Sequence, residues 1–218
     1  MNPVVIFLGI VVIVLLWFLY TYYLSAGALS SGQVDLNKGS TTIEKDKLTN
    51  PGSSNFSYGA WVYVNTWSNT AEKMIISRGN FNIKLGDSTP VLTCKLPTSG
   101  TTPDNFTITN TFPIQKWVYV IISVDGMTMD AYLDGKLVIS KQLSSPITGD
   151  TVNPLVLGGS TPSPDIYLTK VNWWPTAMNP QLAWNNYMQG NGLPSSSQYN
   201  VKLEVLQDNV QQKQFTLF

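Results

Sequence analysis

The amino-terminal end of the chain contains the feature that most restricts how it can fold. Residues 3–24 form a run of 22 residues without a charged side chain, and 19 of them are hydrophobic. As an α-helix this run would extend about 33 Å, roughly the hydrocarbon thickness of a bilayer. Inside lipid every backbone amide needs a partner within its own segment, which makes a helix the expected conformation. We therefore predict a single transmembrane α-helix, with residues 1–24 as a membrane anchor.

Aromatic side chains gather at the far end of this run. Tryptophan and tyrosine rings prefer the headgroup level of a membrane, so this end is expected to lie at the interface. The first basic residue after the run is Lys38. Basic residues near the run are too few to indicate which side of the membrane the rest of the chain occupies. The predicted membrane-interface residues are Trp17, Tyr20, Tyr22 and Tyr23.

Two other interpretations of the apolar run are a cleaved signal peptide and a buried core helix. Ala26-Gly27-Ala28 is a small-x-small triplet of the kind found at cleavage sites. Against cleavage, the run is longer than the usual apolar region of about 7 to 15 residues, and no Lys or Arg precedes it. These features favour an anchor that stays attached to the mature protein.

The composition excludes several classes of function. The chain has no histidine, the commonest general base and metal ligand. Thirteen basic residues balance thirteen acidic ones, and Arg78 is the single arginine, so no basic surface is available for nucleic acid. Cys94 is the single cysteine, which we interpret as an inert buried thiol. We expect no catalytic residues, no cofactor, no metal and no nucleic-acid partner.

The rest of the chain divides into three parts. Residues 25–39 are small and polar, rich in Gly and Ser, and are predicted to form a tether. In residues 40–192, short alternating or apolar runs are separated by Gly, Pro, Asn and Asp. Their spacing of about 8 to 12 residues is typical of an all-β sandwich. We expect one globular domain here, followed by a carboxyl-terminal extension over residues 193–218.

The strands are clearest where turn residues interrupt them. Two Asp-Gly pairs, Asp125-Gly126 and Asp134-Gly135, divide residues 117–141 into three β-rich runs, which predicts a three-stranded meander. Residues 56–65 carry apolar side chains on both sides of the pleat, which predicts a central strand covered on both faces. Further strands are expected at residues 73–77, 80–85, 91–95, 105–109, 155–157 and 166–173.

One short helix and a terminal hairpin complete the pattern. Asn179 can cap the helix, Pro180 suits its first position and Gly190 can end it. After residue 200, apolar and polar residues alternate around Asp208-Asn209, which predicts a hairpin. The hairpin either adds to the sheet edge of a partner or closes this protein's own sandwich. Its candidate partner contacts are Phe215, Leu217 and Phe218.

Five segments in a fixed order carry a family resemblance. The chain resembles the concanavalin A-like lectin/glucanase superfamily in its laminin G-like form, over about 150 of its 218 residues. The resemblance implies a jelly-roll sandwich of two antiparallel sheets. A laminin G-like head with few charges, no histidine and a short tether also resembles membrane-anchored minor structural proteins in virions of large algal DNA viruses. The segments are FSYGAWVYVNTW (56–67), IISRG (75–79), KWVYVIISVDGMTMDAYLDGKLV (116–138), LVLGG (155–159) and PQLAWNNYMQG (180–190).

The superfamily contains enzymes, sugar-binding proteins and structural modules, so the fold alone does not decide the function. Its glucanases use a Glu-x-Asp-x-x-Glu strand, because retaining hydrolysis needs two carboxyl groups about 5 to 5.5 Å apart. Here the glutamates are Glu44, Glu72 and Glu204, and none stands in that pattern. We therefore expect no enzyme activity.

Calcium and sugar binding are the other activities that the resemblance implies. The aspartates lack the spacing of calcium ligands, and we interpret them as turn residues. Exposed tryptophan rings can stack on a sugar, although they can equally fill the core. Adjacent strand residues point to opposite faces, so only one of Trp173 and Trp174 can face the core. The candidate sugar contacts are Trp67, Trp173 and Trp174, and the turn aspartates are Asp125, Asp130, Asp134, Asp150 and Asp165.

Three hypotheses follow from the sequence. The first is a non-enzymatic structural protein, held on a bilayer by one helix, whose head binds other structural proteins such as those of a capsid. Its expected location is a virion's internal membrane and capsid, or otherwise the surface of a cellular membrane. The second is a membrane-anchored lectin with a glycan partner. The third, a hydrolase, is disfavoured because the acidic motif is missing.

Overall fold

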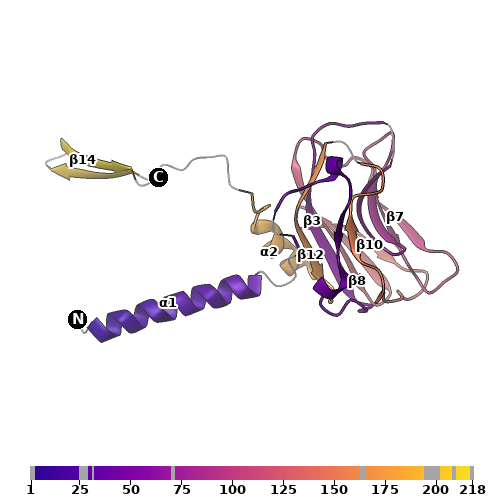
Figure 1. Ribbon diagram of the computed structural model, residues 1–218, viewed down its shortest axis with the longest axis horizontal. Coiled ribbons are helices and arrows are strands. Elements are labelled where there is room, and N and C mark those ends of the chain that lie inside the picture. The colour runs from indigo at the N-terminus through magenta and orange to yellow at the C-terminus, as the bar shows by residue number, and fades with distance from the viewer. Residues whose placement is uncertain are drawn as a thin grey trace.

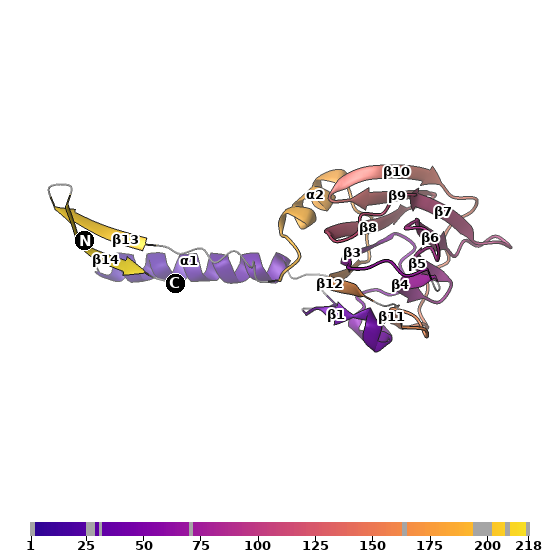
Figure 2. The ribbon, with the colours of Figure 1, turned by 90° about the horizontal axis from the view of Figure 1, so that it is seen from above.

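The head of the protein is a sandwich of two β-sheets, seen edge-on in the computed structural model (Figure 2). A helix at the amino-terminal end and a hairpin at the carboxyl-terminal end lie outside it (Figure 1). Side chains are described throughout the head, in residues 7–17 of the first helix, and not in the hairpin. The structure describes residues 3–24, 29–30, 32–69, 72–162, 165–193, 202–207 and 210–216.

Each sheet contains six strands, and every pair of neighbours is antiparallel. The predicted all-β sandwich is therefore confirmed. In order across sheet A the strands are β1 (Val34–Asp35), β12 (Ile166–Trp174), β3 (Phe56–Val64), β8 (Trp117–Asp125), β9 (Thr128–Leu133) and β10 (Lys136–Gln142). Across sheet B they are β2 (Thr41–Ile43), β11 (Leu155–Leu157), β4 (Lys73–Arg78), β5 (Phe81–Leu85), β6 (Leu92–Leu96) and β7 (Asp104–Thr109). Two short 3₁₀ turns, Leu36–Lys38 and Lys45–Lys47, lie near the start of the head.

The predicted meander is confirmed as β8, β9 and β10. Both Asp-Gly pairs form its turns, because the backbone there needs positive φ values that glycine adopts without a steric cost. The φ angle is +57° at Gly126 and +74° at Gly135, and Asp134 itself has +49°. The other predicted strands are also present, and each end differs from expectation by at most one residue.

Apolar residues on both sides of β3 make this strand the centre of two cores. The main core fills the space between the sheets and includes Phe56, Tyr58 and Trp173. The second core lies on the outer face of sheet A and includes Trp61, Tyr119, Ile121 and Tyr132. The prediction that both faces of this strand are covered is confirmed. Cys94 is fully buried in the main core, as expected.

The helix α2 (Pro180–Met188) covers the second core. Asn179 caps its first turn, since the Asn179 side-chain oxygen accepts a hydrogen bond from the Leu182 amide at 2.8 Å. Gly190, with φ of +69°, follows the end of the helix. Ala183 and Met178 pack onto the sheet beneath. Both helix boundaries therefore lie where the sequence places them.

The sandwich begins earlier than the predicted boundary at residue 40. Val34 and Asp35 pair with β12, and Leu36 is buried in the main core. The Leu29 amide also donates a hydrogen bond to the Val171 carbonyl at 2.8 Å. Part of the segment predicted as a tether thus forms the edge of sheet A. The burial of Leu36 explains this, because a single large apolar side chain can hold a short edge strand in place.

At the amino-terminal end, α1 (Pro3–Leu24) is helical as predicted. Within the part of the chain that the structure describes, no helix combines the length and the apolar character needed to cross a membrane. The helix is confirmed, and its assignment as a transmembrane segment is not. At the other end, β13 (Lys202–Gln207) and β14 (Val210–Thr216) form a two-stranded antiparallel sheet. This predicted hairpin pairs with no described strand of the sandwich. The alternative prediction, that the hairpin closes this protein's own sandwich, is therefore contradicted.

We predict that alanine at Gly135 destabilises the head more than alanine at Gly126. Both glycines end an Asp-Gly turn with positive φ, so either substitution costs about 1–2 kcal/mol of backbone strain. A Cβ at Gly135 would lie 3.0 Å from atoms of Trp184 and Tyr187, whereas a Cβ at Gly126 would meet open space. Crowding against α2 should add about 1–3 kcal/mol to the cost at Gly135. Urea denaturation of the two variants measures this difference, and equal losses would show that α2 does not press on the turn.

Buried tyrosines predict a loss of stability at alkaline pH. Burial raises the pKa of Tyr58 to about 12, although its hydrogen bond with Arg78 acts in the opposite direction. The unfolded chain ionises at a pKa of about 10, so this contribution is complete below pH 10 and is lost as the pH rises to about 12. The stability difference between the wild-type protein and Tyr58→Phe should fall by about 1 kcal/mol between pH 9 and pH 11. Urea denaturation across this range tests it, and a difference that does not change with pH would contradict it.

Candidate binding site

The three tryptophans predicted as sugar contacts do not come together. Trp173 and Trp174 pair with Tyr58 and Ser57 at the start of β3, whereas Trp67 follows its end. A nine-residue strand extends about 30 Å, so these tryptophans cannot contact one small sugar.

Trp173 and Trp174 face opposite sides of sheet A, as predicted for adjacent strand residues. Trp173 is only 2% exposed, its ring stacks on Phe56 with centroids 5.5 Å apart, and its Nε1 donates to the Thr49 carbonyl at 2.8 Å. Trp174 is half-buried against the second core, where Gly59 leaves room for its ring. Trp173 is therefore a core residue that a sugar ring does not reach in this structure.

Trp67 belongs to a cluster built around a buried lysine. Lys73, only 2% exposed, donates from Nζ to the carbonyls of Gly86 at 3.3 Å and Asp87 at 3.2 Å. The same ammonium lies 4.2 Å from the centroid of the Trp67 ring, and Trp67 Nε1 donates to the Ser88 carbonyl at 3.3 Å. These contacts join the loop after β3 to the loop between β5 and β6.

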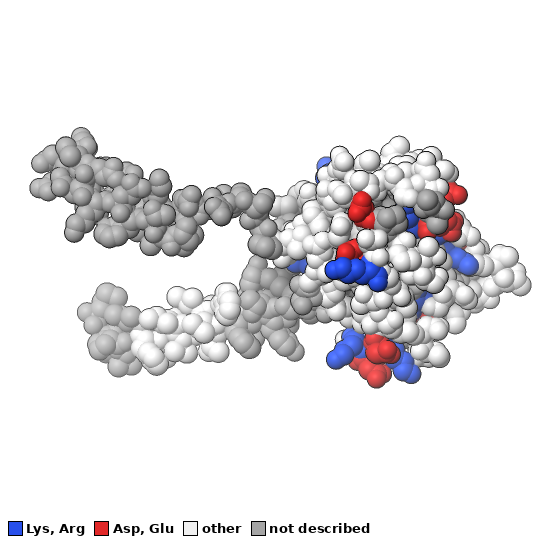
Figure 3. All heavy atoms as spheres, turned by 45° about the horizontal axis from the view of Figure 1, so that its top comes forward, with Lys and Arg blue, Asp and Glu red and all other residues white. Residues whose placement is uncertain are grey.

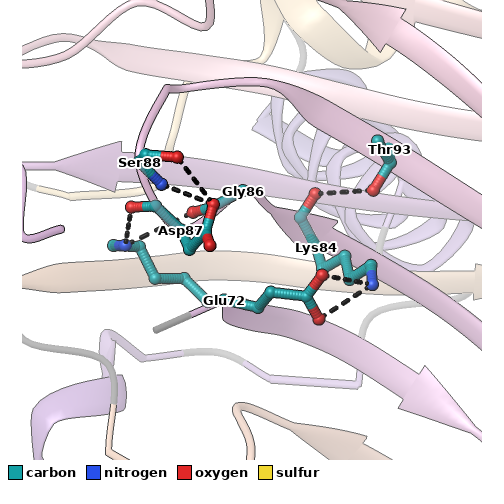
Figure 4. Close-up of polar contacts among 7 residues, drawn as sticks. Glu72, Lys84, Gly86, Asp87, Ser88 and Thr93 are labelled. Atoms are coloured by element: carbon teal, nitrogen blue, oxygen red, sulfur yellow. Dashed lines mark hydrogen bonds and ion pairs between the residues drawn. The ribbon is translucent and has the colours of Figure 1, made fainter. Parts of the chain in front are cut away.

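Charges around this cluster are balanced locally (Figure 4). Desolvation lowers the pKa of Lys73, partly opposed by the nearby Asp87. Hydrogen bonds from Ser88 to the Asp87 carboxylate lower the pKa of that carboxyl. On the adjacent surface, Lys84 pairs with both carboxylate oxygens of Glu72 at 2.8 Å. The cluster thus holds two loops together, and a lysine ammonium covers the Trp67 ring.

A row of half-buried aromatic side chains on sheet A is a better candidate binding site. Tyr63 stands directly opposite Tyr167 on β12 and opposite Trp117 on β8. The Tyr63 centroid is 6.4 Å from that of Tyr167 and 5.3 Å from that of Trp117. All three rings lie on the outer face and are partly exposed. The alternation of side chains along β3 predicts that Tyr63 faces outward. Its two aromatic neighbours depend on the register in which β8 and β12 pair with β3, which no local sequence pattern shows.

The helix α2 extends this row. Tyr187 stacks on the buried Trp61 with centroids 5.5 Å apart, and Trp184 packs beside Tyr187 at the same separation. The Trp184 side chain is 40% exposed. Trp61 and Tyr63 are two residues apart on the same face of β3, so the helix and the row adjoin. We call this set the aromatic surface: Tyr63, Trp117, Tyr167, Trp184 and Tyr187.

Electrostatic charge is low around the aromatic surface. Lys116, next to Trp117, forms an ion pair with Asp134 at 2.8 Å, and this contact raises the pKa of the lysine. The wider surface is also poor in charge: Figure 3 shows a face of the head on which acidic and basic residues are few and intermixed. This surface therefore offers apolar contact and neutral hydrogen-bonding groups rather than charge.

Two buried polar atoms beside the aromatic surface have no hydrogen-bond partner in the structure. They are Nε1 of Trp61 and Oγ1 of Thr169, which stand at directly paired positions of β3 and β12. Buried polar groups are nearly always paired, with protein, a ligand or ordered water. Both atoms are buried, so a ligand on the surface does not reach them in this structure.

The aspartates predicted as turn residues mostly take that role. The Asp134 carboxylate accepts a hydrogen bond from the Tyr119 amide, and Asp150 accepts from the amides of Val152 and Asn153. Asp125 accepts from the Asn55 side chain, and Asp165 from the Thr66 hydroxyl. Within the described ranges, no three acidic or thiol side chains come close enough together to hold a metal ion.

Other predicted site residues lie in the two extensions. Trp17 is exposed on α1, while the side chains of Tyr20, Tyr22 and Tyr23 lie outside the described residues. The backbone of Phe215 is part of β14, opposite Leu203. The side chain of Phe215, together with Leu217 and Phe218, lies outside the described residues. Their roles remain predictions.

Several solved structures share the fold. The binding domain of botulinum neurotoxin DC, in complex with rat synaptotagmin II, has a TM-score of 0.54 and 16% identity, covering 69% of this chain and 39% of that one. The ligand-binding domain of botulinum neurotoxin serotype D, in complex with N-acetylneuraminic acid, has a TM-score of 0.59 and 13% identity, covering 79% and 47%. A type C structure, whose title describes cell entry that depends on two ganglioside molecules, has a TM-score of 0.54 and 15% identity, covering 69% and 39%.

This chain spans less than half the length of these structures, and at such low identity the similarity concerns the fold alone. In a comparison with curated protein sequences, none matched significantly. A family comparison matches residues 35–182, most of the chain, to the concanavalin A-like lectin/glucanases superfamily in a laminin G form. That match begins at β1 and ends within α2, so it covers the whole sandwich. The chain therefore belongs to the concanavalin A-like lectin/glucanases superfamily.

Proposed function

We propose that the protein is a non-catalytic recognition protein whose head binds another macromolecule through the aromatic surface. The observation that carries this proposal is the group of five adjoining aromatic side chains on an outer face with little charge. Tyrosine and tryptophan bury much apolar area at a small cost in conformational entropy, and they dominate the energetics of many interfaces.

The aromatic surface differs from an ordinary hydrophobic core because its side chains are partly exposed. The helix α2 already covers the second core, and Tyr63, Trp117 and Tyr167 remain partly exposed beyond it. Clustered exposed apolar side chains on a folded domain often mark a binding site, whereas single ones do not. A partner that covers this row would complete the burial of the outer face of sheet A.

A protein partner is our first proposal for the ligand, as the sequence analysis expected. A glycan is the second, because sugar rings stack on the exposed faces of tyrosine and tryptophan side chains. The similar toxin structures were solved with a protein partner in one case and with a sugar in another, which is consistent with either class. The head also lacks histidine and the acidic motif of the glucanases, which supports a non-catalytic role.

The test removes rings from the aromatic surface of the full-length protein. Tyr63→Ser with Trp117→Ser should weaken binding at least about tenfold, because two rings at the centre of the surface are lost. The matched control, Leu137→Ser with Val138→Ser, changes two exposed apolar residues of β10. Binding is measured by crosslinking to neighbours in the native setting and on a glycan array. Equal binding by both double variants would contradict the proposal, and the assay that responds identifies the ligand class.

We further propose that residues 1–24 attach the head to a bilayer, as the sequence analysis expected. In support, the structure describes the side chains of residues 7–17 of α1, and the large apolar ones among them are 36% to 68% exposed. An apolar helix that the rest of the chain leaves uncovered is stabilised by a lipid environment. A role in a virion, between membrane and protein shell, remains a prediction that the comparisons do not support.

Membrane attachment predicts a clear result in flotation with lipid vesicles. The full-length protein should rise with the vesicles, and Ile10→Lys with Val14→Lys should leave it in the dense fraction, because each charge costs about 2.5–3.5 kcal/mol at the centre of a lipid-embedded helix. Leu137→Lys with Val138→Lys, which adds the same charge to the head, should still float. Attachment through the helix is refuted if the α1 variant floats as well as the control.

A further inference from the structure

The single arginine of the chain is buried, and no carboxylate of the described residues lies within ion-pair distance of it. Arg78, the last residue of β4, is 3% exposed. The ion pairs among the described residues are Asp35 with Lys38, Glu72 with Lys84, and Lys116 with Asp134. Buried charges are normally paired, because removing an ion from water is costly. Arg78 therefore departs from the usual pattern within the part of the chain that the structure describes.

The hydrogen bonds of Arg78 do not use its full capacity. Its Nε donates to the Asn153 carbonyl at 3.1 Å and its Nη1 donates to Tyr58 Oη at 3.3 Å. Its Nη2 donates to the carbonyl of Asp150. A guanidinium has five N–H groups, so two remain without a protein acceptor. The contacts with Asn153 and Asp150 attach the loop between β10 and β11 to the core, and among the described residues the other two donors have no acceptor.

A cavity lies directly beside the guanidinium. It has a volume of about 20 Å³, enough for one water or a group of similar size. Its lining is mostly apolar, with Phe56, Phe81, Ile147 and Trp173, and it also includes Tyr58, Arg78, Thr148 and Asp150. A hollow of about 480 Å³ adjoins it on the surface, formed mainly by residues 148–153 together with Gly79 and Asn80. Pro97, Thr148 and Asp150 line both spaces. A ligand bound in the hollow can therefore place one small group next to Arg78.

We infer that this hollow binds a small molecule carrying a single carboxylate, with one carboxylate oxygen in the cavity against the two unused donors of Arg78. Arginine suits this task because its planar N–H groups match the geometry of a carboxylate and it stays charged at all relevant pH values. The site is distinct from the aromatic surface, since Tyr58 and Tyr63 are near opposite ends of β3 and face opposite sides of sheet A.

Asp150 lowers the positive potential that a ligand meets beside Arg78. Its carboxylate accepts hydrogen bonds from the amides of Val152 and Asn153 and from the Asn153 side chain, each at 2.9 Å. These bonds help keep it ionised, so it opposes part of the positive potential of Arg78. The remaining attraction doubles for a dianion such as sulfate, but the cost of removing an ion from water rises with the square of its charge, which favours a single charge at this buried place. Acetate is therefore the suitable probe, and sulfate is the matched comparison.

The experiment measures binding of acetate to the full-length protein by saturation-transfer NMR and by thermal shift, at constant ionic strength. Acetate should bind and raise the melting temperature, and sulfate should do neither. Asp150→Asn should bind acetate several-fold more tightly, because it removes the opposing charge and keeps an oxygen acceptor. Arg78→Met should weaken binding at least about tenfold. Lys73→Met, which removes the other buried cation of the described head, should leave acetate binding unchanged.

Two results would overturn the inference. The first is that acetate does not bind to the wild-type protein, which would assign the cavity to ordered water. The second is that Asp150→Asn binds acetate with the same affinity as the wild-type protein. Arg78→Met also frees two backbone carbonyls and so can impair folding. The Asp150→Asn result decides the question in that case, because that variant keeps every contact of Arg78.

Discussion

The burial of β3 on both of its faces is the constraint on which the rest of the head depends. Tyr58, Val62 and other residues of one face need sheet B, and Trp61 on the other face needs the helix α2. A strand that is apolar on both sides cannot lie on an open sheet with one face in water. The chain meets this requirement with two layers of unequal size, because α2 is only nine residues long. Tyr63, which lies beyond the part that α2 covers, stays accessible as a consequence.

The sequence predicts the parts of this fold that depend on local chemistry. Asp134-Gly135 specifies a tight turn wherever it occurs, and Asn179-Pro180 specifies a helix start through one hydrogen bond and one fixed dihedral angle. By contrast, Val34–Asp35 is a two-residue strand that depends on a distant partner, β12, and on the burial of the neighbouring Leu36. No local pattern distinguishes it from the Gly/Ser-rich segment before it, so the sequence analysis extended the tether too far.

The candidate sites needed information that the sequence does not carry locally. Tyr63, Trp117 and Tyr167 form one row because three strands that are distant in sequence align in a particular register. A shift of one residue on any strand would turn its ring into the core. The sequence analysis named Trp173 as a candidate sugar contact, but in the structure its ring packs against Phe56 and Tyr58 in the core. Arg78 stands in no motif, and its importance comes from burial alone.

The two buried cations of the described head, Lys73 and Arg78, are stabilised in different ways. Both donate hydrogen bonds to backbone carbonyls. Lys73 has a compact ammonium, which the Trp67 ring and two carbonyls approach closely, and a lysine can also lose its proton if burial becomes too costly. Arg78 has no such option, because a guanidinium does not deprotonate in proteins. Its charge is partly balanced by the carbonyls of Asn153 and Asp150, by the Trp173 ring, whose centroid lies 5.2 Å from its Cζ, and by the more distant Asp150 carboxylate. Among the described residues, two carbonyls and the Tyr58 hydroxyl occupy three of its five donors, and an anion that enters from the hollow would meet the other two.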